Sequence, residues 1–179
     1  MSTDDPQPLP VFRYYPAAEQ KGAFPENDGL CAGCLRRRGR LYDGVIYGEN
    51  VTSDERFCPW CISEGRVADR GGFINQTQEM VADTPEVDAR TPGFASWQDL
   101  SWPVHHDRPG IFHGVVGAAE LQALDPQATE AMRLTVSDWG WDTVLIDEFL
   151  SQLSMSGSPT GYLWSCAECG QYIAQADFS

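Results

Sequence analysis

Six cysteines are the residues best suited to chemistry in this chain, and they form three Cys-x-x-Cys pairs. Cys31 and Cys34 make the first pair; Cys58 and Cys61 make the second, after a stretch of about two dozen residues. A tetrahedral Zn²⁺ takes four thiolate or imidazole ligands, and a two-residue spacing lets one tight turn present two sulfurs to one ion. The two pairs therefore predict one Zn²⁺ site, laid out as in a treble-clef finger, with the second pair opening a helix.

Cys58-Pro59-Trp60-Cys61 also has an alternative interpretation as a redox dithiol, because Cys-x-x-Cys occurs in thioredoxin-like enzymes. In those enzymes the motif follows a buried strand of a βαβ unit, whereas residues 50–56 of this chain are polar. Zinc is therefore the preferred interpretation.

The third pair, Cys166 and Cys169, is followed by Gly170, which supplies the backbone freedom of a knuckle turn. This pair lacks two ligands. The three histidines of the chain lie within nine residues of one another: His105, His106 and His113. We predict that His106 and His113 complete a second Zn²⁺ site, with His105 as the substitute. The alternative is that these histidines are ordinary surface or core residues and that the pair is an unmetallated hairpin.

The same histidines allow a different chemistry. His105, His106 and His113, helped by Asp107, form a candidate open metal site in which one position remains for water. This set is the basis of an alternative function, a metal-dependent hydrolase.

Charge restricts the classes of partner. Residues 81–179 carry 14 acidic and 3 basic residues, and the whole chain has a net charge of −14. Nucleic-acid binding needs a basic footprint, so this balance argues against it. The one basic cluster, Arg36–Arg40, is open to a nucleic-acid contact or to pairing with nearby acids. We expect the acidic half to dock a basic protein partner.

The N-terminus has no basic start followed by an apolar run, and no stretch of the chain approaches the ~20 apolar residues needed to span a bilayer. A cytoplasmic location with no membrane partner is expected. In that reducing compartment paired cysteines hold metal rather than disulfides.

The pattern predicts an α+β fold in one zinc-stapled domain, residues 11–179, after a flexible tail, residues 1–10. Residues 11–69 form the treble-clef-like module, and residues 70–179 form an irregular middle, two or three helices and a C-terminal zinc-knuckle hairpin. No cofactor other than Zn²⁺ is expected.

In the first part we expect a strand over Val11–Pro16, a β-hairpin over Leu41–Tyr47 with an Asp-Gly turn, and a short helix over residues 61–69. Residues 70–110 hold many Gly and Pro residues and predict irregular structure, with a short helix before Asp83.

In the second part Leu121 and Leu124 lie in a short helix. Asp125-Pro126 predicts the N-cap of a helix to Ser137, and Asp142 the N-cap of Thr143–Ser154. Gly161–Gln175 predicts a strand, a Cys-x-x-Cys-Gly turn and a returning strand.

Five tryptophans lie in the acidic part: Trp97, Trp102, Trp139, Trp141 and Trp164. Aromatic side chains flanked by carboxylates either close a core or form a surface for peptides or cations. The core interpretation is preferred.

The chain resembles the bacterial CbrC-like family, which is associated by name with colicin tolerance. The residues that carry the resemblance run from about residue 10 to the C-terminus: Phe12–Pro16, Cys31, Cys34, Ile46-Tyr47, Cys58–Ile62, Gly65, Arg90–Phe94, Trp97-Gln98, Trp102, Cys166, Cys169 and Gly170. The family tends to have cysteine where this chain has His106, and often another near Gly110. Histidine can replace cysteine as a zinc ligand and glycine cannot, so the resemblance makes His113 or His105 necessary for a second site.

Together these features predict a non-catalytic, zinc-stabilised acidic binding protein that docks a basic protein partner. The resemblance implies a link to toxin tolerance and supplies no reaction.

Overall fold

The chain forms two compact units in the computed structural model, which describes residues 8–98 and 100–178. Most of the expected tail, residues 1–7, lies outside the described part. Unit 1 comprises Met1–Asn75 and Pro85–Gly93, and unit 2 comprises Gln76–Thr84 and Phe94–Ser179. The expected division at residue 70 is close to the first crossing between the units, but the chain then returns to unit 1 for nine residues.

The described elements before residue 94 are short: β1 (Tyr47–Gly48), α1 (Pro59–Ser63), α2 (Arg66–Asp69), β2 (Gly72–Phe73) and α3 (Thr84–Arg90). β1 pairs with β2 in antiparallel fashion. The expected hairpin over Leu41–Tyr47 is wrong, because Leu41 and Tyr42 are buried and the amide of Tyr42 donates to the carbonyl of Phe57. Packing into the core thus overrides the local Asp-Gly turn signal.

The aromatic segment near the N-terminus is a turn rather than the expected strand. The amide of Tyr15 donates to the carbonyl of Phe12, and Phe12, Tyr14 and Tyr15 are all buried. The ring of Phe12 stacks on Phe24 with centroids 5.5 Å apart. These residues form part of the core of unit 1 without forming a sheet.

Gly65 divides the expected helix over residues 61–69 into α1 and α2. Its φ is +82°, a left-handed conformation that interrupts the helix, and the side chain of Arg90 lies against it. The expected helix before Asp83 is also misplaced, since α3 begins at Thr84.

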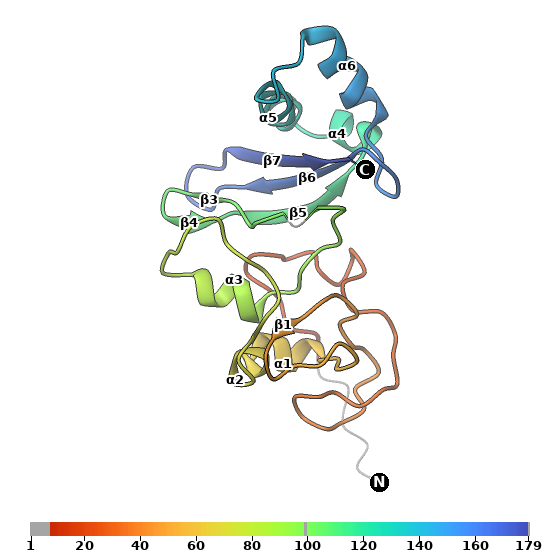
Figure 1. Cartoon of the computed structure of the whole chain (residues 1–179), viewed down its shortest axis with the longest axis vertical. Helices are drawn as coiled ribbons and strands as arrows, with labels where there is room; N and C mark the ends of the chain where they lie inside the picture. The colour runs from red at the N-terminus through yellow and green to blue at the C-terminus, as the bar shows by residue number, and fades with distance from the viewer. Residues whose placement is uncertain (1–7, 99, 179) are drawn as a thin grey trace. The chain divides into compact units, whose positions relative to one another are not determined.

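Unit 2 is a three-stranded antiparallel sheet covered on one face by helices (Figure 1). Its described elements are β3 (Val104–His105), β4 (Arg108–Pro109), β5 (Ile111–Val116), α4 (Ala118–Ala123), α5 (Pro126–Ser137), α6 (Thr143–Gln152), β6 (Thr160–Ser165) and β7 (Tyr172–Asp177). The sheet order is β5-β6-β7, and β3 pairs with β4 in a separate hairpin.

Three expectations for unit 2 are confirmed. Asp125 caps α5 by accepting from the amide of Gln127, and Asp142 caps α6 by accepting from the amide of Leu145. β6 and β7 flank the third cysteine pair, as expected. The sequence did not reveal β5, because Gly114 interrupts its apolar run at a bulge in the pairing with β6.

The core of unit 2 has an aliphatic and an aromatic side. Buried residues such as Met132, Leu150 and Leu163 join the helices to the sheet. A second cluster includes Phe112 and Trp164, whose ring centroids lie 4.8 Å apart. Such close packing fixes the ends of β6 and β7, between which Cys166 and Cys169 lie.

The helices of the described residues are all too short or too polar to cross a lipid bilayer.

Candidate metal centres

Four cysteine sulfurs converge in unit 1. Cys31 and Cys34 lie in a tight turn, Cys58 precedes α1, and Cys61 lies within it. Their Sγ atoms all lie within 4.8 Å of one another. Ligands ~2.0–2.3 Å from a common tetrahedral centre are about 3.3–3.8 Å apart, so this spacing suits one shared ion. We call these four residues the all-cysteine group.

Backbone hydrogen bonds shape the first turn. The amide of Leu35 donates to the carbonyl of Cys31 at 2.8 Å, and the amide of Cys31 donates to the carbonyl of Arg36 at 3.0 Å. The amide of Cys58 donates to Cys31 Sγ at 3.2 Å and so links the two pairs. An N–H donor supports a sulfur that carries negative charge, as in the outer shell of metal sites.

Gly33 lets the two pairs approach each other. A Cβ atom at this position would lie 3.0 Å from both Cβ and Sγ of Cys61, and 3.1 Å from the ring of Phe57. A side chain here would push the sulfurs apart.

The thiols of Cys31, Cys58 and Cys61 cannot all ionise freely without a cation. Contacts with Cys58 and then Cys61 lower the pKa of Cys31, whereas the contact with Cys31, followed by that with Cys58, raises the pKa of Cys61. One thiolate is thus stabilised at the expense of its neighbours. A bound divalent cation removes this conflict, because it favours the ionised form of every sulfur.

A second group of four forms in unit 2. Cys166 and Cys169 lie in the turn between β6 and β7, and His105 and His106 lie in the hairpin of β3 and β4. Cys166 Sγ is 3.7 Å from His106 Nδ1, and Cys169 Sγ is 3.7 Å from His105 Nδ1. All four ligand atoms lie within 4.8 Å of one another, which again suits one tetrahedral ion. We call this set the histidine–cysteine group.

The hairpin turn explains how two consecutive histidines reach one point. His106 and Asp107 have φ values of +54° and +55°, the left-handed pair that a two-residue type I′ turn requires. Trp102 anchors this hairpin, since its indole N–H donates to the carbonyl of Gly110 at 2.7 Å. The rings of His105 and His106 lie with centroids 4.0 Å apart.

The environment of Cys166 favours its thiolate. Burial acts to raise the pKa, but hydrogen bonds from the backbone of Cys169 and Glu168, with contacts to the two histidines, outweigh it and lower the pKa of Cys166 to about 6. The sulfur is therefore prepared to act as a ligand.

The structure differs from the prediction in the choice of histidines. His105, the expected substitute, joins His106 in the group, and His113 does not. His113 lies on β5 at the bulge, where its Nε2 is 2.8 Å from Ser165 Oγ. The sequence offered a signal for His105, because two adjacent residues in a tight turn can bind the same ion. The strands β3 and β4 that form this turn were not predicted, since the composition of their segment indicates irregular structure.

The matches to known proteins extend over the all-cysteine group and the histidine–cysteine group. The model of an uncharacterised protein family, UPF0167, matches residues 9–178. This chain belongs to the UPF0167 family. UPF0167 proteins of Mycobacterium bovis and Mycobacterium tuberculosis are each 36% identical over 184 residues, covering 99% of this chain and 97% of theirs. A UPF0167 protein of Pseudomonas aeruginosa is 30% identical over 179 residues, covering 96% of this chain and 98% of its own. No solved structure matches the chain.

The two candidate centres of this UPF0167 chain differ in exposure. In the all-cysteine group three residues are buried and Cys34 is half-buried, whereas in the histidine–cysteine group His106 and Cys169 are exposed. Solvent and chelators therefore reach the second group more easily.

Gly110 cannot contribute to the second centre of this family member. A Cβ atom there would lie 3.0 Å from Cβ of Trp164, and its carbonyl already accepts from Trp102. With two histidines from the hairpin, the histidine–cysteine group has four donors without it.

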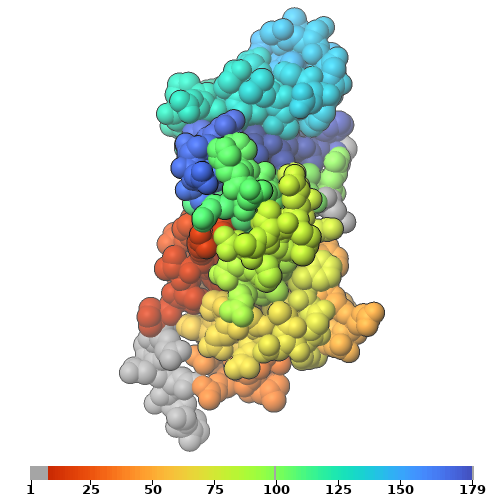
Figure 2. All heavy atoms as spheres, turned by 90° about the vertical axis from the view of Figure 1, so that its left-hand side faces the viewer, coloured from red at the N-terminus to blue at the C-terminus, as the bar shows by residue number. Residues whose placement is uncertain are grey.

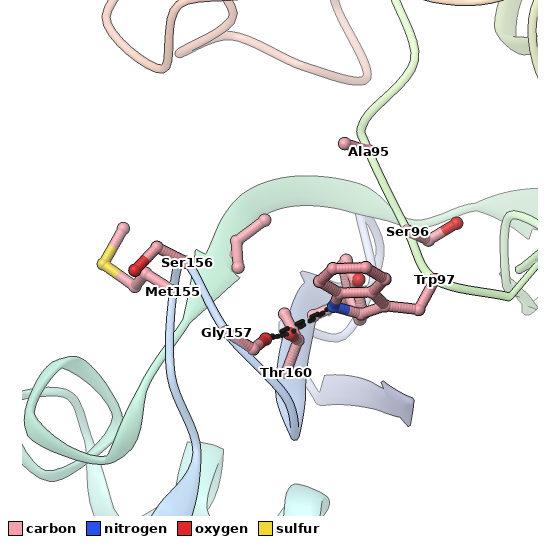
Figure 3. Close-up of a pocket in the computed structure, with 9 residues that line it drawn as sticks. Ala95, Ser96, Trp97, Met155, Ser156, Gly157 and Thr160 are labelled. Carbon is pink, nitrogen blue, oxygen red and sulfur yellow. Dashed lines mark hydrogen bonds between the residues drawn. The ribbon is translucent and has the colours of Figure 1, made fainter. Parts of the chain in front are cut away.

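Unit 2 also has an apolar pocket of about 260 Å³ (Figure 3). The indole N–H of Trp97 lies 3.3 Å from both the carbonyl of Gly157 and Thr160 Oγ1, so the ring is fixed at its edge. Met155 and Tyr162 are among the nine lining residues, none of which is an acid, a histidine or a cysteine. The pocket therefore contains no residue of the histidine–cysteine group.

Proposed function

We propose that this protein is a non-catalytic, zinc-stabilised binding protein whose acidic residues dock a basic protein partner. The observation that carries the proposal is the number of protein donors, four for each of the two candidate centres. A tetrahedral site with four protein ligands is closed, as in structural zinc sites, whereas catalytic zinc keeps a position for water.

Zinc suits both donor sets. Thiolate and imidazole ligands in tetrahedral arrangement select Zn²⁺ over the hard cations, which prefer oxygen. For the all-cysteine group we propose a treble-clef-like finger, in which the turn at Cys31 and Cys34 faces a pair at the start of α1. The support is the ligand layout, and the expected hairpin between the pairs is absent from the described residues.

The position of His113 works against the hydrolase alternative. That function needs an open site built from three histidines, and His113 bonds to Ser165 instead. With His105 and His106 both facing cysteine sulfurs, the hairpin offers a closed donor set.

Charge supports a basic partner. Unit 2 has 13 acidic and 2 basic residues, a net charge of −11. Such a surface repels nucleic acid and accelerates the encounter with a cationic protein. We place the protein in the cytoplasm, where reduced thiols remain available to metal. The link to colicin tolerance rests on the resemblance to CbrC-like proteins and stays a prediction.

Metal content after single substitutions tests the zinc part. Purified protein should contain two zinc ions per chain, Cys58→Ser and His105→Ala should each contain one, and the matched control His113→Ala should keep two. A single ion that is lost in His113→Ala would overturn the proposal in favour of the open site. Binding of a basic peptide that weakens as salt rises tests the docking part.

A further inference from the structure

The loop between α5 and α6 has the symmetric sequence Asp138-Trp139-Gly140-Trp141-Asp142. The two indole rings meet edge to face, with centroids 5.1 Å apart. Both rings also contact Phe149, at 5.3 and 5.5 Å, and Phe178, at 5.4 and 6.1 Å. We call the four rings of Trp139, Trp141, Phe149 and Phe178 the aromatic patch.

Core packing explains half of this patch. Phe149 is buried and Trp141 packs against the hydrophobic core. Trp139 and Phe178 keep 36% and 45% of their surface exposed. Among the described hydrogen bonds, neither indole N–H of the loop has an acceptor. Two part-exposed aromatic rings, beside indole N–H groups without a described acceptor, fit an interface better than a core.

The charge around the patch is negative. Asp138 and Asp142 are both exposed and flank the two tryptophans in the sequence. Residues 118–152, which include the three helices, hold seven acids and one base. The base, Arg133, pairs with Asp147 at 2.6 Å. In Figure 2 the segment 118–152, in teal to light blue, forms a continuous part of the surface of unit 2.

The ring geometry restricts how a cation can bind. Every pair of rings in the patch has centroids within 6.2 Å. The rings therefore fill the space between them, and no cage remains for a cation at the centre. A cation must instead contact the rings from outside, where Trp139 keeps 36% of its surface exposed. A planar guanidinium suits this position, because it stacks on an indole face and pairs with a carboxylate at its edge.

Unit 1 already contains the same kind of contact. The guanidinium of Arg38 lies over the ring of Trp60, 5.0 Å from its centroid. An arginine thus covers a tryptophan ring in unit 1, whereas no cation–π contact with the part-exposed Trp139 is found among the described residues.

We propose that the aromatic patch is the docking site for an arginine-containing segment of the basic partner, with one guanidinium stacked on Trp139 and paired with Asp138 or Asp142. This inference rests on the proposed function, because it names the surface and the side chain that the acidic unit recognises. A second copy of this chain is a poor occupant, since each copy carries a net charge of −14.

The test uses the full-length metal-loaded protein and fluorescein-labelled synthetic peptides with four arginines, four lysines or four glutamines, spaced by Gly-Ser. Fluorescence anisotropy at low salt gives the Kd. The arginine peptide should bind at least threefold tighter than the lysine peptide, and the glutamine peptide should not bind. Trp139→Ala should weaken arginine-peptide binding about tenfold, as expected for a hot-spot aromatic.

The charge variant is Asp138→Asn/Asp142→Asn, which removes two charges and keeps an asparagine cap on α6. It should weaken binding five- to tenfold. Two matched controls should change binding less than twofold: Trp97→Ala, at another exposed tryptophan, and Asp125→Asn/Glu130→Gln, which removes two charges at the N-cap and in the body of α5. Circular dichroism and zinc content verify folding.

The outcomes distinguish a failure of the arginine-docking inference from a failure of the proposed docking function. If the arginine peptide binds and all four variants behave alike, the acidic docking function stands and the patch is overturned. If neither cationic peptide binds the wild-type protein, the docking function itself fails. If the glutamine peptide binds as well as the arginine peptide, the surface recognises apolar segments, and the arginine inference is wrong.

Discussion

Leu35 and Gly170 occupy the same position in two equivalent turns, and both have positive φ values, +56° and +74°. In each turn the amide of this residue donates to the carbonyl of the first cysteine, at 2.8 Å for Leu35 and 3.0 Å for Gly170. Each first cysteine donates in turn to the carbonyl five residues ahead, that of Arg36 or Gln171. The two Cys-x-x-Cys segments therefore fold alike, although only the second has the expected glycine.

This equivalence predicts that substitution destabilises one turn and leaves the stability of the other unchanged. Gly170→Ala should lower the free energy of unfolding by about 1 kcal/mol, because an L-residue pays for the left-handed conformation. Leu35→Gly should leave stability unchanged within about 1 kcal/mol, since relief of that strain offsets the greater entropy of glycine in the unfolded chain. Urea denaturation of the two variants measures the difference. A Leu35→Gly variant that is much less stable would show that the exposed leucine has a packing role.

Loss of one ligand of the all-cysteine group should unfold unit 1. Structural zinc contributes an apparent ~10–16 kcal/mol in finger peptides, which is comparable to the ~5–15 kcal/mol total stability of a domain. Cys31→Ala or Cys58→Ala should therefore lose one zinc ion and the near-ultraviolet circular dichroism of the buried aromatic rings of unit 1. An unchanged melting curve with unchanged zinc content in Cys58→Ala would contradict this account. Cys169→Ser serves as the comparison, because it should lose the other ion.

The two ions should leave in a fixed order. Cys169 and His106 are exposed, whereas three of the four residues in the all-cysteine group are buried. A chromogenic chelator should therefore remove one equivalent at least tenfold faster than the second, because it reaches exposed ligands directly. In His105→Ala the fast equivalent should be missing. Release of both equivalents at a single rate in the wild-type protein would show that burial does not control access.

Gly33→Ala should weaken metal binding by the all-cysteine group. The added methyl group would lie 3.0 Å from Cys61 Sγ, so the two pairs must separate. The expected result is a zinc affinity at least tenfold lower for this group, measured by competition with a chelator. Glu168→Ala, at the equivalent position of the other turn, is the control and should leave both affinities unchanged.

Asp177→Asn should destabilise unit 2. The buried Asp177 carboxylate accepts from the amides of Trp97 and Gln98, at 2.7 and 3.2 Å, and from the hydroxyl of Tyr162. An asparagine keeps one acceptor oxygen for the two amides but replaces the charged acceptor with a neutral one, at a cost of about 2 kcal/mol. Thermal unfolding measures the loss. The exposed Asp138→Asn is the matched control and should change stability by less than about 0.5 kcal/mol.

The cysteine spacing and the helix caps could be predicted from the sequence because both are local. Two sulfurs three positions apart share one turn whatever surrounds them, and Asp125 and Asp142 cap helices through amides two or three residues away. The same locality revealed the strand, turn and strand around Cys166. The positions of the acidic and basic residues in the sequence established the uneven charge.

The tertiary structure decided which histidines join the second group. The hairpin of β3 and β4 is held by Trp102 and by its strained turn, neither of which has a strong local signal, and it places His105 rather than His113 beside Cys169. It also decided that Leu41 and Tyr42 enter a core instead of a hairpin, and that Trp139 stays exposed while Trp141 packs inward. Each of these outcomes depends on contacts between residues far apart in the chain, where packing free energy outweighs local propensity.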